Sequence, residues 1–189
     1  EFDQDIMGEY TGAGVIFGAT GGVMEAALRT AHYVLTGKEH EAIKFEAVRG
    51  MKGLKEASLE IAGKELKVAI ASGMKNAKVL LDQIREGNSP YTFIEIMGCP
   101  GGCINGGGQP FVKPMFLPNE DTNILDTYKE LRAQALYSED ERQALRQSHN
   151  NTQIQALYKE FLGKPNSHKA HELLHTTYSG KVRFPKNEE

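Results

Sequence analysis

The sequence predicts an α/β lobe, a mixed or parallel sheet with flanking helices, followed by an all-helical C-terminal extension. Up to about residue 112, apolar residues switch between the period of two that is typical of strands and the period near 3.6 that is typical of helices. Beyond Pro118, helix-forming residues dominate and the only glycines are Gly163 and Gly180. We therefore expect a lobe at 1–112, a proline-rich linker at 113–118 and a helical tail at 119–189.

The lobe elements follow from periodicity and turn residues. An apolar face predicts a helix over 22–36, which Thr20 would cap and Gly37 would end. Alternating residues on either side of Ala62-Gly63 predict a hairpin. The expected order in the lobe is an extended segment at 13–17, the helix at 22–36, a strand at 43–48, a hairpin of 56–61 and 64–72, a helix at 74–86 and a buried strand at 91–96. In the tail we expect helices at about 122–137, 139–148, 150–162 and 167–177.

Length and charge exclude several classes of protein. A chain of 189 residues fits one domain or one and a half, and needs no disulfides to bury a core. The net charge of −3 argues against a nucleic-acid partner, and we find neither an apolar run near the ~20 residues of a membrane span nor a signal peptide. We therefore expect a cytoplasmic location. Because the chain starts at Glu1 without Met, we expect that something was removed or that this is a piece of a longer polypeptide.

Glycine is concentrated in two short windows. Of 20 glycines, 11 lie in these windows, and both cysteines lie in the second. The first window holds Gly12, Gly14, Gly18, Gly21 and Gly22, and the second holds Gly98, Gly101, Gly102, Gly106, Gly107 and Gly108. Such density indicates backbone that approaches another group closely. The first window lacks the G-x-G-x-x-G spacing of a dinucleotide site, which leaves tight packing or a cofactor pocket.

The cysteine loop, residues 97–110, admits several interpretations. A disulfide between Cys99 and Cys103 would close a very small loop with little entropic gain. A thioredoxin-type pair requires Cys-x2-Cys, and a zinc site requires two further ligands. Thiolates among glycines favour an iron–sulfur cluster, while a free-thiol or structural role, zinc and a disulfide remain open. A cubane normally takes four cysteines, so a chain with two needs the others from elsewhere.

Four segments resemble the iron-only hydrogenase family. The loop MGCPGGCINGGGQP resembles the third signature segment of these enzymes, and TGAGVIFGATGGVMEAALRTA at 11–31 resembles another stretch of their catalytic domain. The segment from AVRGMKG to IREG follows the same family, and the tail resembles its small-subunit region. The resemblance covers residues 8–180 and implies reversible reduction of protons to dihydrogen at an H-cluster, a 4Fe–4S cluster joined to a two-iron subsite with CO and CN ligands.

The resemblance also implies roles for individual residues. Cys99 matches a ligand of the 4Fe–4S cluster, and Cys103 matches the ligand that also bridges to the two-iron subsite. Met97, Phe17 and Val23 match residues around that subsite. Gly18, Gly21 and Gly22 are the cofactor-binding glycines that the same segment implies.

The rest of the implied active site lies outside this sequence. The remaining cluster cysteines belong to two earlier segments of the types TSCCP and MPCxxKxxE, and neither occurs here. The implied partners are therefore the N-terminal half of the same enzyme and an electron donor such as ferredoxin or an NAD-linked subunit. The alternatives are a hydrogenase-like iron–sulfur assembly protein and a non-catalytic sensory homologue. Glu25 and Glu95 are weaker candidates for a proton relay; we expect Glu25 to serve the first helix turn and Glu95 to need a buried partner.

Overall fold

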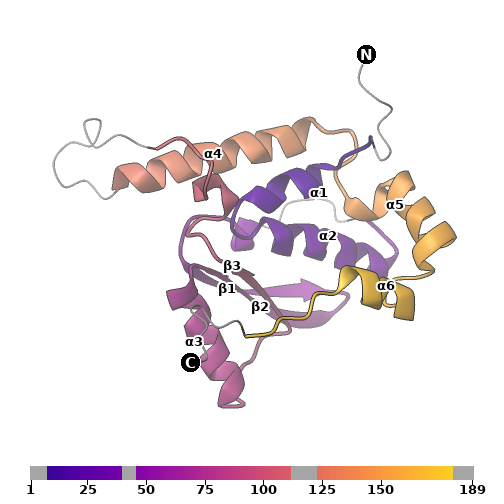
Figure 1. The fold of residues 1–189 in the computed structure, drawn as a ribbon, viewed down its shortest axis with the longest axis horizontal. Coiled ribbons are helices and arrows are strands. Elements are labelled where there is room, and N and C mark those ends of the chain that lie inside the picture. The colour runs from indigo at the N-terminus through magenta and orange to yellow at the C-terminus, as the bar shows by residue number, and fades with distance from the viewer. Residues whose placement is uncertain (1–7, 40–45, 112–122, 181–189) are drawn as a thin grey trace, which may run out of the picture. The chain divides into compact units, whose positions relative to one another are not determined.

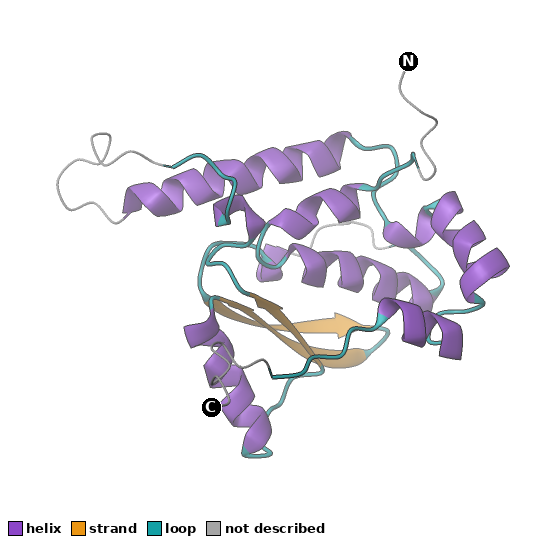
Figure 2. Cartoon of the chain, viewed as in Figure 1, coloured by secondary structure: helices purple, strands orange, loops and turns teal. Residues whose placement is uncertain are grey.

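A computed structural model describes residues 8–39, 46–111 and 123–180 (Figure 2). The chain divides into two compact units, Glu1–Asn151 and Thr152–Glu189. The first unit holds the sheet and the cysteine loop.

A mixed three-stranded sheet forms the centre of the first unit (Figure 1). Strands β1 (Leu54–Ile61) and β2 (Lys64–Ser72) pair antiparallel through the turn Ala62–Gly63, where both residues have positive φ (53° and 73°). Strand β3 (Phe93–Met97) pairs parallel with β2. The predicted hairpin is confirmed, and the positive φ at the second turn residue explains why a glycine, Gly63, stands there.

Helices cover both faces of the sheet. Helix α2 (Gly22–Thr36) packs Met24 and Leu28 against Val68 and Ile70 of β2. Helix α3 (Met74–Arg85) packs on the opposite face, where its buried residues Ala77 and Leu80 meet Ala69 and Ala71 of the same strand. Both faces of β2 are therefore buried, which explains why Val68 to Ala71 read as a continuous apolar run.

The structure corrects three predictions near the chain start. Residues 13–17 are not extended: α1 (Gly12–Val15) is followed by a 3-10 turn (Ile16–Gly18), because the Thr11 hydroxyl accepts a hydrogen bond from the Gly14 N–H (3.0 Å) and caps the turn. The described part of the predicted strand 43–48 is another 3-10 turn, Glu46–Val48, and 43–45 lie outside the described residues. Thr20 does not cap α2; Gly21 is its N-cap, and Gly37 ends the helix as predicted.

Strand β3 is less buried than the sequence suggests. Phe93 and Ile96 are 42% and 43% exposed, and Glu95 is the strand's one buried residue. The reason is position, because β3 lies at the end of the described strand order and has a neighbour on one side only. Aromatic and β-branched residues predict a strand without distinguishing its edge from its centre.

Helix α4 (Asn123–Arg142) is one continuous helix, where the sequence suggested a break between 137 and 139. It belongs to the same compact unit as the sheet and packs on α1 (Figure 1). The predicted linker falls almost entirely on residues outside the described ranges. In the second unit, α5 (Thr152–Leu157) continues into a π-helical turn (Tyr158–Leu162), and α6 (His168–Leu174) is capped by the Ser167 hydroxyl.

A buried ion network joins α2 to α4. The Arg29 guanidinium, 1% exposed, donates to both oxygens of Asp140 (2.8 Å each) and to Glu25 (2.8 Å). Arg146 donates to the other side of Asp140, and Arg49 donates twice to Glu25 (2.7 and 2.8 Å). Burial alone would raise the pKa of Asp140, but hydrogen bonds from Arg29 and Arg146 bring that pKa below its ordinary value. Glu25 was expected to interact with the first turn of its helix; in the structure it also accepts hydrogen bonds from Arg29 and Arg49.

Replacing Arg29 with Met should destabilise the chain by about 3 kcal/mol, because one partner of a buried ion pair is removed and the others stay buried. Urea unfolding followed by circular dichroism measures the change. The control is Lys78→Met, which removes an exposed partner of Asp82 on α3 and should leave the urea midpoint unchanged. Equal midpoint shifts in the two variants would contradict the structural weight given to Arg29.

Candidate functional site

The cysteine loop starts at the carboxyl end of the parallel strand pair. Met97 is the last residue of β3 and pairs with Ser72, the last residue of β2. The loop then runs through Cys99 to a short 3-10 turn, Cys103–Asn105. Ligand sites of open α/β sheets occur at this end of parallel strands, which makes the loop the first candidate site.

Both cysteines are free and exposed. The predicted alternative of a disulfide is therefore absent. Backbone bonds hold the loop in shape: the Gly102 N–H donates to the Cys99 carbonyl and the Gly106 N–H to the Cys103 carbonyl, each at 3.0 Å. A Cβ on Gly106 would lie 3.6 Å from the Cys99 sulfur, whereas one on Gly98 or Gly107 would meet no described atom within 4 Å. Two accessible soft thiols with open space beside them suit a bulky inorganic cluster.

The two glycine windows contact each other directly. The Thr20 N–H donates to the Gly101 carbonyl at 3.0 Å. Gly102 has φ +97°, and a Cβ there would lie 2.6 Å from the Gly18 carbonyl oxygen and 3.0 Å from the Met97 sulfur. This contact requires glycine at 102, and it brings Gly18 and Met97 to the residue that precedes Cys103.

At the three glycines predicted to bind a cofactor, other protein atoms occupy the space that a side chain would take. A Cβ would lie 1.7 Å from the Ile16 carbonyl oxygen at Gly22, 2.0 Å from the Val48 carbonyl oxygen at Gly21, and 2.7 Å from a Leu136 methyl at Gly18. Close packing therefore explains these glycines, as one of the two interpretations of the window predicted. Their binding of a cofactor stays a prediction.

The three predicted apolar site residues lie on separate elements. Phe17 is 45% exposed in the 3-10 turn before α2. Val23 lies in the first turn of α2 and Met97 at the end of β3, both half-buried. Of these three, the structure brings Met97 against the glycine contact described above.

Helix α4 supports the cysteine loop from behind. The Arg132 guanidinium donates to the carbonyls of Ile104 (2.9 Å) and Pro110 (2.8 Å). Ile104 packs with Ala19 and Ala133, so one apolar cluster joins both glycine windows to α4. The sequence analysis missed Arg132, because a basic residue on a predicted helix gives no signal that distinguishes a loop-holding role from a solvated one.

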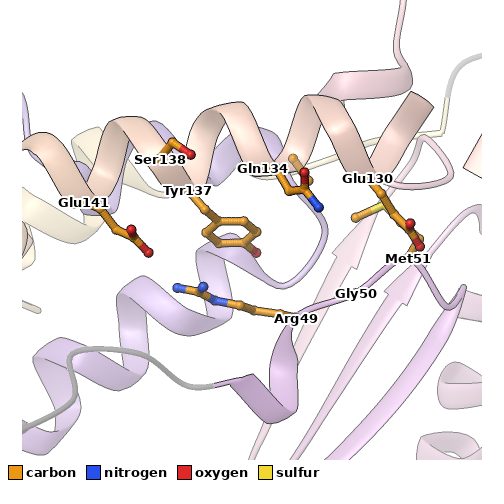
Figure 3. A pocket seen from close by; sticks show the side chains of 9 residues that line it. Arg49, Gly50, Met51, Glu130, Gln134, Tyr137, Ser138 and Glu141 are labelled. Carbon is orange, nitrogen blue, oxygen red and sulfur yellow. The ribbon is translucent and has the colours of Figure 1, made fainter. Parts of the chain in front are cut away.

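A cavity of about 500 Å³ lies beside that cluster (Figure 3). It lies between segment 49–51 and α4, and its walls include Met51 and Ala133, which belong to or pack against the same cluster. The Arg49 guanidinium lies over the Tyr137 ring (Figure 3), and its central carbon is 4.0 Å from the ring centroid. Neither cysteine lines this cavity, so it is separate from the candidate site.

Two buried charges flank the first glycine window. Glu95 accepts hydrogen bonds from the N–H groups of Gly21 and Met24, both at 2.7 Å, so a strand carboxylate caps α2 in place of Thr20. Lys55 donates to the carbonyls of Thr20 (2.9 Å) and Gly50 (2.8 Å). Burial lowers the pKa of Lys55 to about 8, against the opposing attraction of Glu95. Glu95 thus has the buried partners that the sequence analysis said it would need, and Lys55 was missed.

In the described ranges, no group of three or more histidine, cysteine or acidic side chains is arranged to hold a metal ion. None of the helices in those ranges has the length and apolar character that crossing a membrane requires.

The fold is an α/β lobe that carries two exposed thiols in a glycine-rich loop at the end of a parallel strand pair. Residues 1–107 match the family model described as iron only hydrogenase large subunit, C-terminal domain. Residues 126–181 match the model described as iron hydrogenase small subunit. The chain belongs to the iron-only hydrogenase family.

Known relatives agree with this family. The chain is 46% identical over 172 residues to iron hydrogenase 1 of Clostridium pasteurianum, covering 91% of this chain and 29% of that protein. A solved FeFe-hydrogenase from Chlamydomonas reinhardtii superposes with a TM-score of 0.64 at 39% identity, covering 93% of this chain and 48% of the other. Cytosolic iron-sulfur assembly component 3 of Mus musculus is 33% identical over 85% of this chain and 31% of its own length. The chain thus spans less than half of each.

The lowered pKa of Lys55 predicts a pH dependence of stability. Between about pH 8 and 10.5 the unfolded chain holds a proton on Lys55 that the folded chain has released. The free energy of unfolding should therefore rise with pH in this window by up to about 3 kcal/mol relative to Lys55→Met, and the gain should be lost as pH falls through 8. Urea unfolding at intervals from pH 7 to 10.5 measures it.

The matched control is Lys67→Met, which removes an exposed lysine from the neighbouring strand. A gain of the same size measured against this control would show that the pH dependence does not come from Lys55.

Proposed function

We propose that this chain is part of an iron-only hydrogenase that catalyses the reversible reduction of protons to dihydrogen. One observation carries the proposal: a chain of this family presents two free, exposed thiols in a glycine loop at the carboxyl end of β3. The sequence contains two cysteines, and a 4Fe–4S cluster takes four. The chain therefore supplies part of the ligand set, not all of it.

The residues present fit the H-cluster that the family implies. Cys99 would hold the 4Fe–4S cluster, and Cys103 would hold the cluster and bridge it to the two-iron subsite. When bound, the H-cluster supplies electron transfer and an open metal site for dihydrogen. The donor set supports this assignment, because both thiols are accessible and Gly98 and Gly107 leave open space beside them.

The chain's own residues orient and shield this site. Backbone bonds from Gly102 and Gly106 fix the two cysteine carbonyls and with them the path of the loop. Met97, Phe17 and Val23 are apolar and would exclude water around the two-iron subsite, which strengthens electrostatic interactions there. Gly18, Gly21 and Gly22 allow the glycine windows and α2 to pack closely. We also propose that these three glycines lie on the side of the loop that faces the cofactor.

The proposed partners follow from the missing ligands. An N-terminal half of the same enzyme would supply the other cluster cysteines. An electron donor such as ferredoxin or an NAD-linked subunit would exchange electrons with the cluster. We keep the cytoplasm as the proposed location.

An iron–sulfur assembly protein is the second candidate function. The 33% identical mouse relative, named a cytosolic iron-sulfur assembly component, supports it. The 46% identical relative is named an iron hydrogenase and supports the first candidate more strongly. Infrared bands of CO and CN separate the two, because only a protein with the two-iron subsite carries these ligands.

The direct test reconstitutes the polypeptide that contains this chain and the rest of the catalytic domain. Iron, sulfide and the two-iron subsite are added, and dihydrogen evolution from reduced viologen is measured. We expect turnover together with CO and CN infrared bands. A fully loaded cluster without turnover would favour a sensory homologue, and iron–sulfur loading without those bands would favour the assembly protein.

Replacing Cys103 with Ser should remove the two-iron subsite, because the bridging thiolate is lost. The CO and CN infrared bands should fall below about a tenth of the wild-type intensity, with at least a 10²-fold loss of dihydrogen evolution. Circular dichroism before loading controls for folding, which should be unchanged because Cys103 is exposed. Full retention of the infrared bands would overturn the assignment of Cys103 as the bridge.

A further inference from the structure

One row of residues crosses the sheet beneath the first glycine window. Lys55 of β1 pairs with Ile70 of β2, and Ile70 pairs with Glu95 of β3. Residues paired in one row point to the same face of a sheet, and Ile70 belongs to the core under α2. Lys55 and Glu95 therefore approach the start of α2 from either side of Ile70. Both are buried, with 8% and 6% exposure.

The two charges hold opposite ends of a single peptide group. The carbonyl of the Thr20–Gly21 peptide accepts from the Lys55 ammonium at 2.9 Å. The N–H of the same peptide donates to the Glu95 carboxylate at 2.7 Å. The second carboxylate oxygen accepts from the Met24 N–H, which ties the peptide to the first turn of α2. The peptide cannot rotate without breaking a charge-assisted hydrogen bond.

This arrangement exceeds what capping α2 requires. A serine or threonine beside the helix would satisfy the same N–H groups without burying a charge. Removing two charges from water is costly, so burial of both indicates a demand for fixed orientation. Gly21 needs that orientation, because its φ is +91° and a Cβ there would lie 2.0 Å from the Val48 carbonyl oxygen.

Thr20, whose carbonyl belongs to the clamped peptide, is hydrogen-bonded to the cysteine loop through its own N–H. The N–H of Thr20 donates to the Gly101 carbonyl at 3.0 Å. Gly102, next in the chain, packs against the Gly18 carbonyl and the Thr20 nitrogen and precedes Cys103. A short chain of contacts therefore runs from Lys55 and Glu95 through Thr20 to the backbone between the two cysteines.

We propose that Lys55 and Glu95 are positioning residues that clamp the Thr20–Gly21 peptide, hold the cysteine loop through the Thr20–Gly101 bond, and shift the reduction potential of the cluster in opposite directions. The clamp stands on the geometry alone, and its effect on the potential rests on the proposed function. Reduction adds negative charge to a cluster, so a buried cation favours the reduced state and a buried anion disfavours it.

Amide hydrogen exchange tests the clamp in the chain without iron. Glu95→Gln keeps the side-chain shape but loses the charge and one acceptor oxygen. Exchange at the Gly21 and Met24 amides should accelerate at least about tenfold, since a hydrogen bond to a charged group is lost. The matched control, Glu60→Gln at an exposed position of β1, should leave both rates unchanged. Unchanged rates in Glu95→Gln would overturn the clamp.

Potentiometric titration of the loaded enzyme at pH 7 tests the effect on the cluster. Lys55→Met should lower the reduction potential and Glu95→Gln should raise it, while Lys55→Arg, which keeps the charge, should stay close to wild type. The double variant should return toward the wild-type potential. A merely structural role predicts shifts of the same sign or none, and either result would overturn the proposed tuning.

The two measurements also separate this inference from the proposed function. If the unsubstituted enzyme shows no dihydrogen turnover, the proposed function fails while the exchange result still decides the clamp. If the unsubstituted enzyme turns over but amide exchange is unchanged in Glu95→Gln, the clamp is overturned and the proposed function stands. Glu95→Asp serves where Glu95→Gln does not fold; its shorter carboxylate should accelerate the same two amides, and wild-type rates would count against the clamp.

Discussion

The hydrogen bond from the Thr20 N–H to the Gly101 carbonyl is the constraint on which the rest of the first unit depends. It joins two backbone segments about eighty residues apart, and it forms only because side chains are absent where they meet, at Gly102 above all. Each surrounding element serves this meeting. Strand β3 leads into the cysteine loop, α2 starts two residues after Thr20, and Arg132 of α4 donates a hydrogen bond to the loop. The cysteines thus project from a loop whose path protein contacts define.

The first unit contains two separate groups of buried charged residues. Lys55 and Glu95 act beneath the glycine window, while Arg29 and Asp140 tie α2 to α4 farther along the helix. The second network also joins the regions that match the two family models. Arg29 lies in the large-subunit match and Asp140 in the small-subunit match. Helix α4 is therefore integral to the unit that carries the cysteines, although its sequence resembles another subunit. Buried ion pairs contribute little net stability compared with apolar packing, but they penalise wrong arrangements strongly.

Periodicity predicted the elements whose stability is local or whose pattern is long. The hairpin, α2 and α3 formed where the sequence pattern placed them, and the Cys-x3-Cys loop indicated the family. The errors have a common physical cause. Residues 13–17 suggested an extended segment but are helical because Thr11 caps them, and β3 is apolar yet partly exposed because it lies at an edge. Thr20 looked like a cap, whereas the cap is Glu95, more than seventy residues away. A single sequence carries no record of such long-range partners, so Lys55 and Arg132 left no signal at all.

Sharing a cluster between two parts of a polypeptide links metal binding to assembly. Under the proposed function, Cys99 and Cys103 supply two thiolates and the remaining ligands come from another part of the enzyme. Each half alone then binds the cluster with an incomplete ligand set, and the loaded cluster itself holds the halves together. Cluster binding and association of the two parts are thermodynamically linked. Contacts that hold the thiolates in place before the cluster binds therefore strengthen cluster binding and association by the same free energy. The glycine contact and the clamp beneath it provide that pre-organisation on this side, because they fix the loop through protein bonds alone. Under the proposal above, the buried pair Lys55 and Glu95 contributes to this pre-organisation through the hydrogen bond from Thr20 to Gly101.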